Sequence, residues 1–190
     1  MRKELLLMKK VLLFSLITLV TTLAVFAYET IIIKYPAGER WEKAYYKKVG
    51  NEAILQYVPN TESRANWNRT IIIHSYFDSQ LPVKYIISRD AAKMRKMNPS
   101  GKYSFIKITP NDAIITRCTD DYKDIKAQCE FYRITNAHNG IVSIHYINRN
   151  KDDFKANYYL WYEIIKNAKL YNTYYRDERI LDKAEYFELW

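Results

Sequence analysis

Glycine and proline are scarce in this sequence. Four glycines and five prolines among 190 residues leave no room for a flexible or Pro-rich linker, so the composition excludes an obvious domain boundary inside the chain. The sequence also lacks a glycine-rich phosphate loop and a GxSxG nucleophile elbow. Neither a phosphate-binding loop of the usual kind nor a standard serine hydrolase motif is therefore predicted.

Histidine is also rare, and its spacing does not indicate a metal site. The three histidines, His74, His138 and His145, form neither an HExxH helix nor an HxH pair. His74 and His145 fall in strand-like runs, where a partner for general-base chemistry would have to come from distant sequence. The sequence thus predicts no catalytic residue, no metal ligand and no cofactor. A hydrolase whose site is assembled only in three dimensions, with His74 or His145 as base, stays open as the alternative.

The N-terminus has a basic start and a short apolar stretch at residues 11–26. A membrane-spanning helix usually needs about 20 apolar residues, and this stretch is shorter and contains serine and threonine. We therefore predict a signal peptide, residues 1–27, rather than the alternative of a membrane anchor. The initiator is Met1 or Met8. After cleavage, one domain of residues 28–190 without a permanent membrane span is expected.

Only two cysteines are present, Cys118 and Cys129. An even count in an exported chain favours a disulfide, because such bonds persist in oxidising compartments. Two cysteines without nearby histidines are too few for a structural zinc site, and the spacing is not CxxC. We predict a Cys118–Cys129 bridge in a periplasmic or secreted protein, with two free thiols as the alternative.

The apolar period predicts mixed secondary structure. β-Branched and aromatic runs closed by turn residues predict strands, and apolar residues at helical spacing predict two helices. The predicted strands are residues 30–35, 53–58, 70–77, 103–108, 113–117, 129–135 and 141–147, and the helices are 82–97 and 152–170. A weaker amphipathic helix is predicted in residues 176–190. This order favours an α+β fold, a single domain with an antiparallel β-sheet packed by helices in an α/β/α sandwich-like arrangement.

The element order resembles a known architecture. A YP hairpin-like start before Trp41, then ILQYVP, then Trp67 leading into a strand, a helix, an antiparallel run and a final helix resemble the PsbP-like α/β/α sandwich. The layout is equally similar to small exported bacterial proteins of unknown function. The resemblance implies a binding or assembly module rather than an enzyme, and it carries over no functional residue.

Tyrosine is unusually frequent, with eighteen in the chain. Its large apolar ring and polar hydroxyl suit partly exposed interfaces. We therefore take the tyrosines around the last predicted helix as the candidate interaction surface: Tyr158, Tyr159, Tyr162, Tyr171, Tyr174 and Tyr175. Packing of these rings in the core is the alternative. The predicted function is non-enzymatic binding of a protein or envelope component, in the bacterial envelope or at the host interface.

Basic residues exceed acidic ones, which gives a formal net charge of +9. Part of this excess lies on the polar face of the first predicted helix: Lys84, Arg89, Lys93, Arg95 and Lys96. Such a face suits anionic lipid or nucleic acid, but a solvated basic surface is the simpler interpretation. Because the chain is predicted to be exported, no nucleic acid partner is expected.

Overall fold

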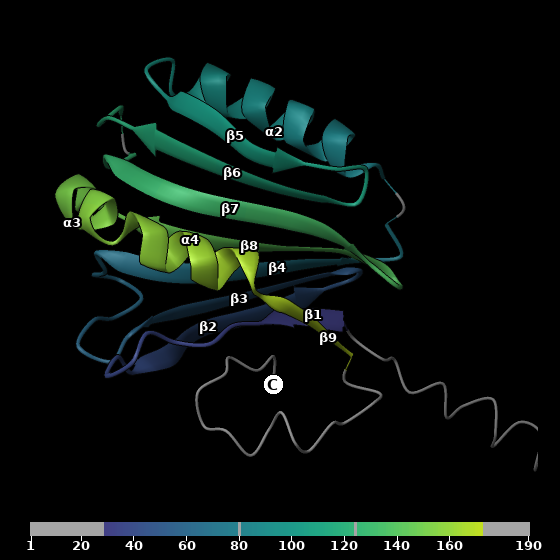
Figure 1. The fold of residues 1–190 in the computed structure, drawn as a ribbon, viewed down its shortest axis with the longest axis horizontal. Helices are drawn as coiled ribbons and strands as arrows, with labels where there is room; N and C mark the ends of the chain where they lie inside the picture. Colours follow the sequence, from purple (N-terminus) through teal and green to yellow (C-terminus); the bar gives the residue numbers. More distant parts are fainter. Residues whose placement is uncertain (1–28, 80, 124, 173–190) are drawn as a thin grey trace, which may run out of the picture.

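The computed structural model describes residues 29–79, 81–123 and 125–172. The predicted signal peptide, the weaker C-terminal helix, Tyr174 and Tyr175 lie outside these residues. Seven antiparallel strands form the main sheet in the order β2-β3-β4-β8-β7-β6-β5 (Figure 1). Their bounds are Trp41–Val49 (β2), Glu52–Pro59 (β3), Arg69–Phe77 (β4), Lys102–Ile108 (β5), Asp112–Thr119 (β6), Gln128–Ala137 (β7) and Gly140–Asn148 (β8). A separate two-stranded sheet pairs β1, Glu29–Ile32, with β9, Lys169–Asn172.

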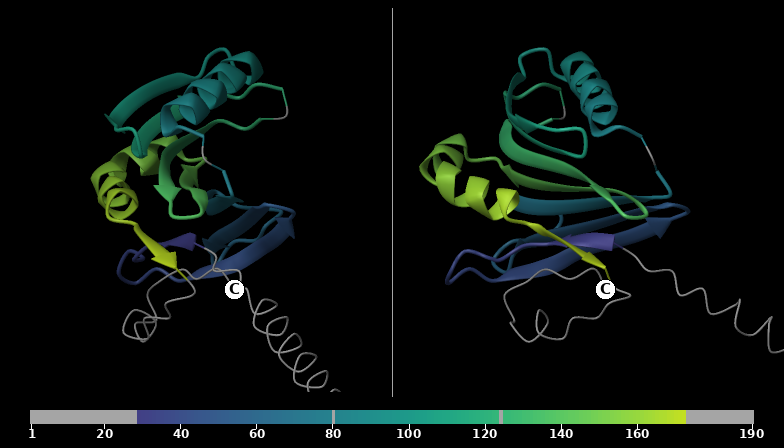
Figure 2. Two further views of the ribbon diagram at one scale, coloured as in Figure 1. Left: turned by 90° about the vertical axis from the view of Figure 1, so that its right-hand side faces the viewer. Right: turned by 45° about the vertical axis from the view of Figure 1, so that its right-hand side comes forward.

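Helices pack on both faces of the main sheet, as Figure 2 shows. Helices α3 (Lys151–Ala156) and α4 (Tyr158–Lys166) cover one face, whereas α2 (Val83–Met97) covers the other. Successive side chains of a strand point to opposite faces, so neighbouring residues of β7 enter different cores. Phe131 packs against α3 and α4, and Tyr132 packs in the α2 cluster. The predicted α+β fold with an antiparallel sheet is confirmed.

The tight β7–β8 hairpin closes where the sequence NAHNG predicts a turn. Gly140 follows the turn with φ +151°, and a Cβ atom there would lie 2.1 Å from the Tyr76 carbonyl oxygen. Only glycine fits this approach of two backbones without displacement. The hairpin places β8 beside β4, which joins the β2-β3-β4 and β5-β6-β7-β8 meanders into one sheet.

The predicted disulfide is present. Cys118 on β6 and Cys129 on β7 lie directly opposite each other in the strand register and are bonded. Closing a loop of this length stabilises the fold by about 3 kcal/mol in the chain-entropy model. Since such bonds persist mainly in oxidising spaces, the disulfide indicates an extracytoplasmic compartment.

Residues 151–172 differ from the prediction of one helix over residues 152–170. The helix breaks at Asn157, whose side chain donates to the carbonyl oxygen and a carboxylate oxygen of Asp153. Such local side-chain bonds compete with the regular helix. The second helix, α4, ends at Lys166. There the guanidinium of Arg133 donates to the carbonyl oxygens of Ile165, Lys166 and Ala168. Strand β9 begins three residues after Lys166, at Lys169.

Strand β2 was not predicted. It lies at the edge of the sheet, carries several charged side chains and has a register shift between Lys43 and Tyr45. The shift breaks the two-residue period by which a strand is recognised. None of the helices that the structure describes is long and apolar enough to cross a membrane.

Candidate functional site

The candidate site is an apolar groove between α4 and the segment that follows β1. Its volume is about 430 Å³, which is within the range of ligand-binding pockets, about 300–1,000 Å³. We call it the α4 groove. Its lining residues are Ile32, Lys34, Tyr35, Pro36 and Ala37 on one wall, Leu160, Glu163, Ile164 and Asn167 on the other, and Lys169.

One stripe of helix α4 forms a wall of the α4 groove. Leu160, Glu163 and Ile164 are three and four residues apart, so they share one stripe of the helix, and the C-cap residue Asn167 continues the same spacing. A second stripe, with Trp161 and Ile165, is buried in the core. The buried stripe packs on the sheet and fixes the orientation of α4. This orientation also fixes the position of the stripe that lines the groove.

Strand pairing brings the opposite wall next to α4. Ile32 on β1 pairs with Lys169, the first residue of β9, and Asn167 and Ala168 separate this strand from the end of α4. After β1, a turn bonds the amide of Glu39 to the carbonyl oxygen of Pro36 and turns the chain away. Tyr35 is half-buried in this wall, and burial, with the neighbouring Tyr57, raises the pKa of its phenol. The phenol therefore remains neutral at physiological pH.

Charged groups border the groove on both sides. Lys34 and Lys169 belong to one side, and Glu163 belongs to the helix. The hydrogen bond from Lys166 Nζ, 2.9 Å away, holds the pKa of the Glu163 carboxyl below its usual range. The site thus offers an apolar floor between cationic and anionic groups, as suits a segment that buries apolar side chains and keeps polar atoms at the rim.

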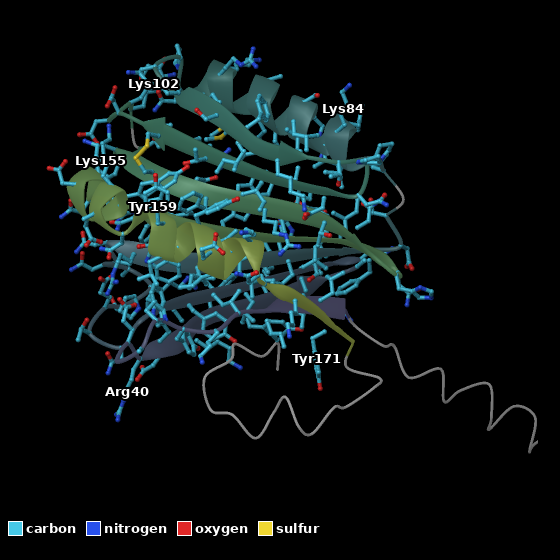
Figure 3. All side chains as sticks on the ribbon, in the orientation of Figure 1. Arg40, Lys84, Lys102, Lys155, Tyr159 and Tyr171 are labelled. Carbon is cyan, nitrogen blue, oxygen red and sulfur yellow. A yellow bond between two sulfur atoms is a disulfide. The ribbon has the colours of Figure 1, made fainter. Side chains whose placement is uncertain are left out.

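The tyrosines proposed from the sequence occupy different environments. Tyr159 is 81% exposed on α4, next to the exposed Leu160 of the groove (Figure 3). Tyr158 and Tyr162 are half-buried and lie over Phe131, at ring-centroid distances of 4.8 and 6.3 Å. Tyr171 is buried in β9. Of the described tyrosines in the set, Tyr159 alone presents most of its ring to solvent.

A polar cluster lies on the other face of the sheet, on the side of α2. The buried Glu130 carboxylate lies 2.5 Å from Nε of Arg117 and 3.5 Å from Nδ1 of His145. Nε2 of His145 lies 3.3 Å from Oγ of Ser143. On β4, Nε2 of His74 lies 3.5 Å from a carboxylate oxygen of Glu52. The structure thus brings both strand histidines next to carboxylates.

This cluster is packed rather than open. Tyr132 stacks on His145 with ring centroids 4.3 Å apart. Ser143 is only 2% exposed, and its hydroxyl also contacts the carbonyl oxygen of His74 at 3.4 Å. Within the described parts of the chain, no three His, Cys, Asp or Glu side chains gather as a metal site.

The α2-side cluster makes the folded state sensitive to acid. Burial lowers the pKa of His74 below 6.5, as does His145, although Glu52 and Asp90 oppose the shift. Burial would raise the pKa of Glu130, but Arg117 and His145 lower it below 4.5. As the pH falls, both His74 and Glu130 therefore bind a proton at a higher pH in the unfolded chain than in the folded one. Stability should fall as pH drops below about 6.5, and again below about 4.5.

Urea unfolding at several pH values measures this dependence. The wild type should lose stability between pH 6.5 and 5.5, at no more than about 1.4 kcal/mol per pH unit for one histidine. His74→Gln should flatten this segment of the curve, while the loss below pH 4.5 remains. If the stability of His74→Gln depends on pH as that of the wild type does, His74 is not the group that causes the loss between pH 6.5 and 5.5.

Sequence reasoning missed the groove and the Glu130–Arg117 pair. The α4 stripe was detectable as a second set of helical positions beside the core stripe. The wall at residues 32–37 had no signal, because it depends on the β1–β9 pairing of distant segments. Glu130 stood out only as the one acidic residue of β7.

The structure is thus a single α+β domain with an apolar groove that is open to solvent. A family model matches residues 33–173, most of the chain, so the chain belongs to that family, one of unknown function. No curated protein and no solved structure matches it, PsbP included.

Proposed function

We propose that this chain is an exported, non-enzymatic binding protein that acts in the periplasm or after secretion. It would be made with residues 1–27 as signal peptide, and residues 28–190 would form the mature domain. The disulfide supports export. The element order of the sequence, which resembles that of the PsbP-like sandwich, implies binding or assembly, although no PsbP structure matches the chain. The partner would be a protein or component of the bacterial envelope, or a host molecule if the producing bacterium is host-associated.

The α4 groove carries this proposal. Its walls are mainly apolar, its lining residue Leu160 is exposed, and the exposed Tyr159 precedes Leu160 on α4. Exposed apolar area next to a groove is typical of protein-binding surfaces. We therefore take the occupant to be an apolar segment of a partner protein, with the charges at Lys169 and Glu163 bordering its polar atoms.

Site-specific photocrosslinking in the producing cell tests the proposal. A photoreactive amino acid at Ala37, an exposed position in the groove wall, should give a discrete adduct with one partner protein. The same group at Val49, exposed at the end of β2, should not give this adduct. Leu160→Glu should abolish the Ala37 adduct, because a carboxylate replaces an apolar contact.

The control outcomes are specific. Circular dichroism should show that Leu160→Glu retains the fold, because Leu160 is an exposed position of α4. An Ala37 adduct only within the same chain, or one equally strong from Val49, would contradict binding in the groove.

One observation favours the alternative, a secreted hydrolase with His145 as base. His145 lies between the Ser143 hydroxyl and the Glu130 carboxylate, in the order of a serine triad. A nucleophile must however meet its substrate, and Ser143 is buried. A fluorophosphonate probe discriminates the two functions: we expect no labelling, and labelling that disappears in Ser143→Ala would establish the hydrolase.

A further inference from the structure

The outward face of α2 concentrates positive charge. The helix contains five basic residues and one acidic residue. The basic side chains are exposed, and Arg95 and Lys96 lie in the last turn, where they also complement the helix dipole. We call this the α2 basic face, formed by Lys84, Arg89, Lys93, Arg95 and Lys96 (Figure 3 labels Lys84).

Acidic neighbours do little to neutralise this face. Asp90 lies 4.0 Å from Arg89, and it also accepts a hydrogen bond from the Tyr132 hydroxyl at 3.2 Å. Among the residues that the structure describes, no ion pair involves Lys84, Lys93, Arg95 or Lys96. The positive potential over the helix is therefore directed to solvent.

Exposed apolar side chains accompany these charges. Tyr85 is 55% exposed in the first turn of α2, Leu81 precedes the helix, and Met97 ends it. They are separate from the stripe that holds the helix on the sheet, which is Val83, Ile86, Ile87 and Ala91. The helix thus buries one apolar stripe in the core and exposes further apolar groups among cations.

We propose that the α2 basic face docks on an anionic phospholipid surface. Basic residues near such a surface are attracted to the lipid headgroups, and exposed aromatic and aliphatic side chains enter the interface. This combination favours lipid over nucleic acid, whose phosphates would leave Leu81, Tyr85 and Met97 in water.

Docking through α2 leaves the α4 groove accessible. The two helices pack on opposite faces of the sheet, as the alternation of Phe131 and Tyr132 requires. A protein held at a bilayer by α2 would therefore present its groove away from the lipid. The inference adds a second surface to the proposed function and does not depend on it.

Vesicle flotation tests the docking surface. The sample is the disulfide-bonded protein, purified from the producing cell after any processing there. The protein should float with phosphatidylglycerol-containing vesicles at low salt and not with pure phosphatidylcholine vesicles. Lys93→Glu/Lys96→Glu should weaken partitioning by about 20-fold or more, since each basic residue near the surface contributes about 1 kcal/mol. Tyr85→Ser should weaken it by a few-fold at any salt concentration.

A matched control separates local docking from net charge. Arg40→Glu/Lys47→Glu makes the same change of charge at exposed positions remote from α2 (Figure 3 labels Arg40 and Lys84). This variant should float like the wild type. Equal losses in both double variants, equal flotation with neutral vesicles, or no flotation would overturn the proposal. Binding of duplex DNA that requires Lys93 and Lys96, without vesicle binding, would overturn it in favour of nucleic acid.

Discussion

Replacing Trp161 by alanine is expected to lower the free energy of unfolding by about 4 kcal/mol. Trp161 is 1% exposed. Its ring stacks on Tyr146, with centroids 3.6 Å apart, and meets Trp41 edge-on at 5.6 Å. The truncation removes these contacts and leaves a large cavity between α4 and the sheet, which close packing cannot fill without movement. Urea or guanidinium unfolding measures the loss.

Tyr159→Ala is the matched control on the same helix. This ring is 81% exposed, so its removal should change the unfolding free energy by no more than about 0.5 kcal/mol. A cost for Trp161→Ala below about 1 kcal/mol would mean that α4 is not anchored by this stack. The groove wall on α4 would then not be held in place by the packing of Trp161 on the sheet.

Replacing Glu130 by glutamine should cost about 3 kcal/mol, because it leaves the largely buried Arg117 guanidinium without its anionic partner. Glu130 is itself 1% exposed, and its carboxylate also faces His145. The glutamine keeps the shape of the side chain but not its charge. Denaturant unfolding at neutral pH measures the difference, since the wild-type carboxyl, with its lowered pKa, is fully ionised there.

A double variant distinguishes a charge effect from a packing effect. Replacing both partners, in Arg117→Met/Glu130→Leu, removes both buried charges and fills the space with apolar groups. Such replacements are often neutral or stabilising, so the double variant should recover most of the stability lost in Glu130→Gln. If it is as unstable as the single variant, the loss arises from packing, and the interpretation of Glu130 as a paired buried charge is wrong.

Most of the sheet was predictable because its strands follow local rules. Strands β3 to β8 have β-branched or aromatic runs closed by turn residues, and their approximate bounds were correct. Strand β2 was missed because an edge strand needs little apolar pattern, and its bulge removes the period that remains. Strand β9 was missed because the helical spacing continues as far as Ala168 in the sequence. Its strand form depends on pairing with β1, at the other end of the described chain.

The candidate sites were harder to predict, for the same reason. The basic residues of α2 belong to the polar face of one helix, so spacing placed them at the surface. Tyr159 was proposed only as one of six tyrosines, from composition, and the sequence did not separate it from the half-buried Tyr158 and Tyr162. Ile32 and Ile164 line one groove only because the β1–β9 pairing sets them together. Likewise, nothing local in the sequence indicates that Arg117 and Glu130 are cross-strand partners; the disulfide one position away fixes that register.

The central claim is that the α4 groove binds an apolar segment of a partner, and calorimetric titration tests it most directly. The protein captured from Ala37 should be titrated into wild type, Leu160→Glu and Lys93→Glu/Lys96→Glu. We predict a negative heat-capacity change for the wild type, as apolar burial requires, an affinity at least about tenfold weaker for Leu160→Glu, and an unchanged affinity for the α2 variant. Equal affinities for the wild type and Leu160→Glu would contradict the claim.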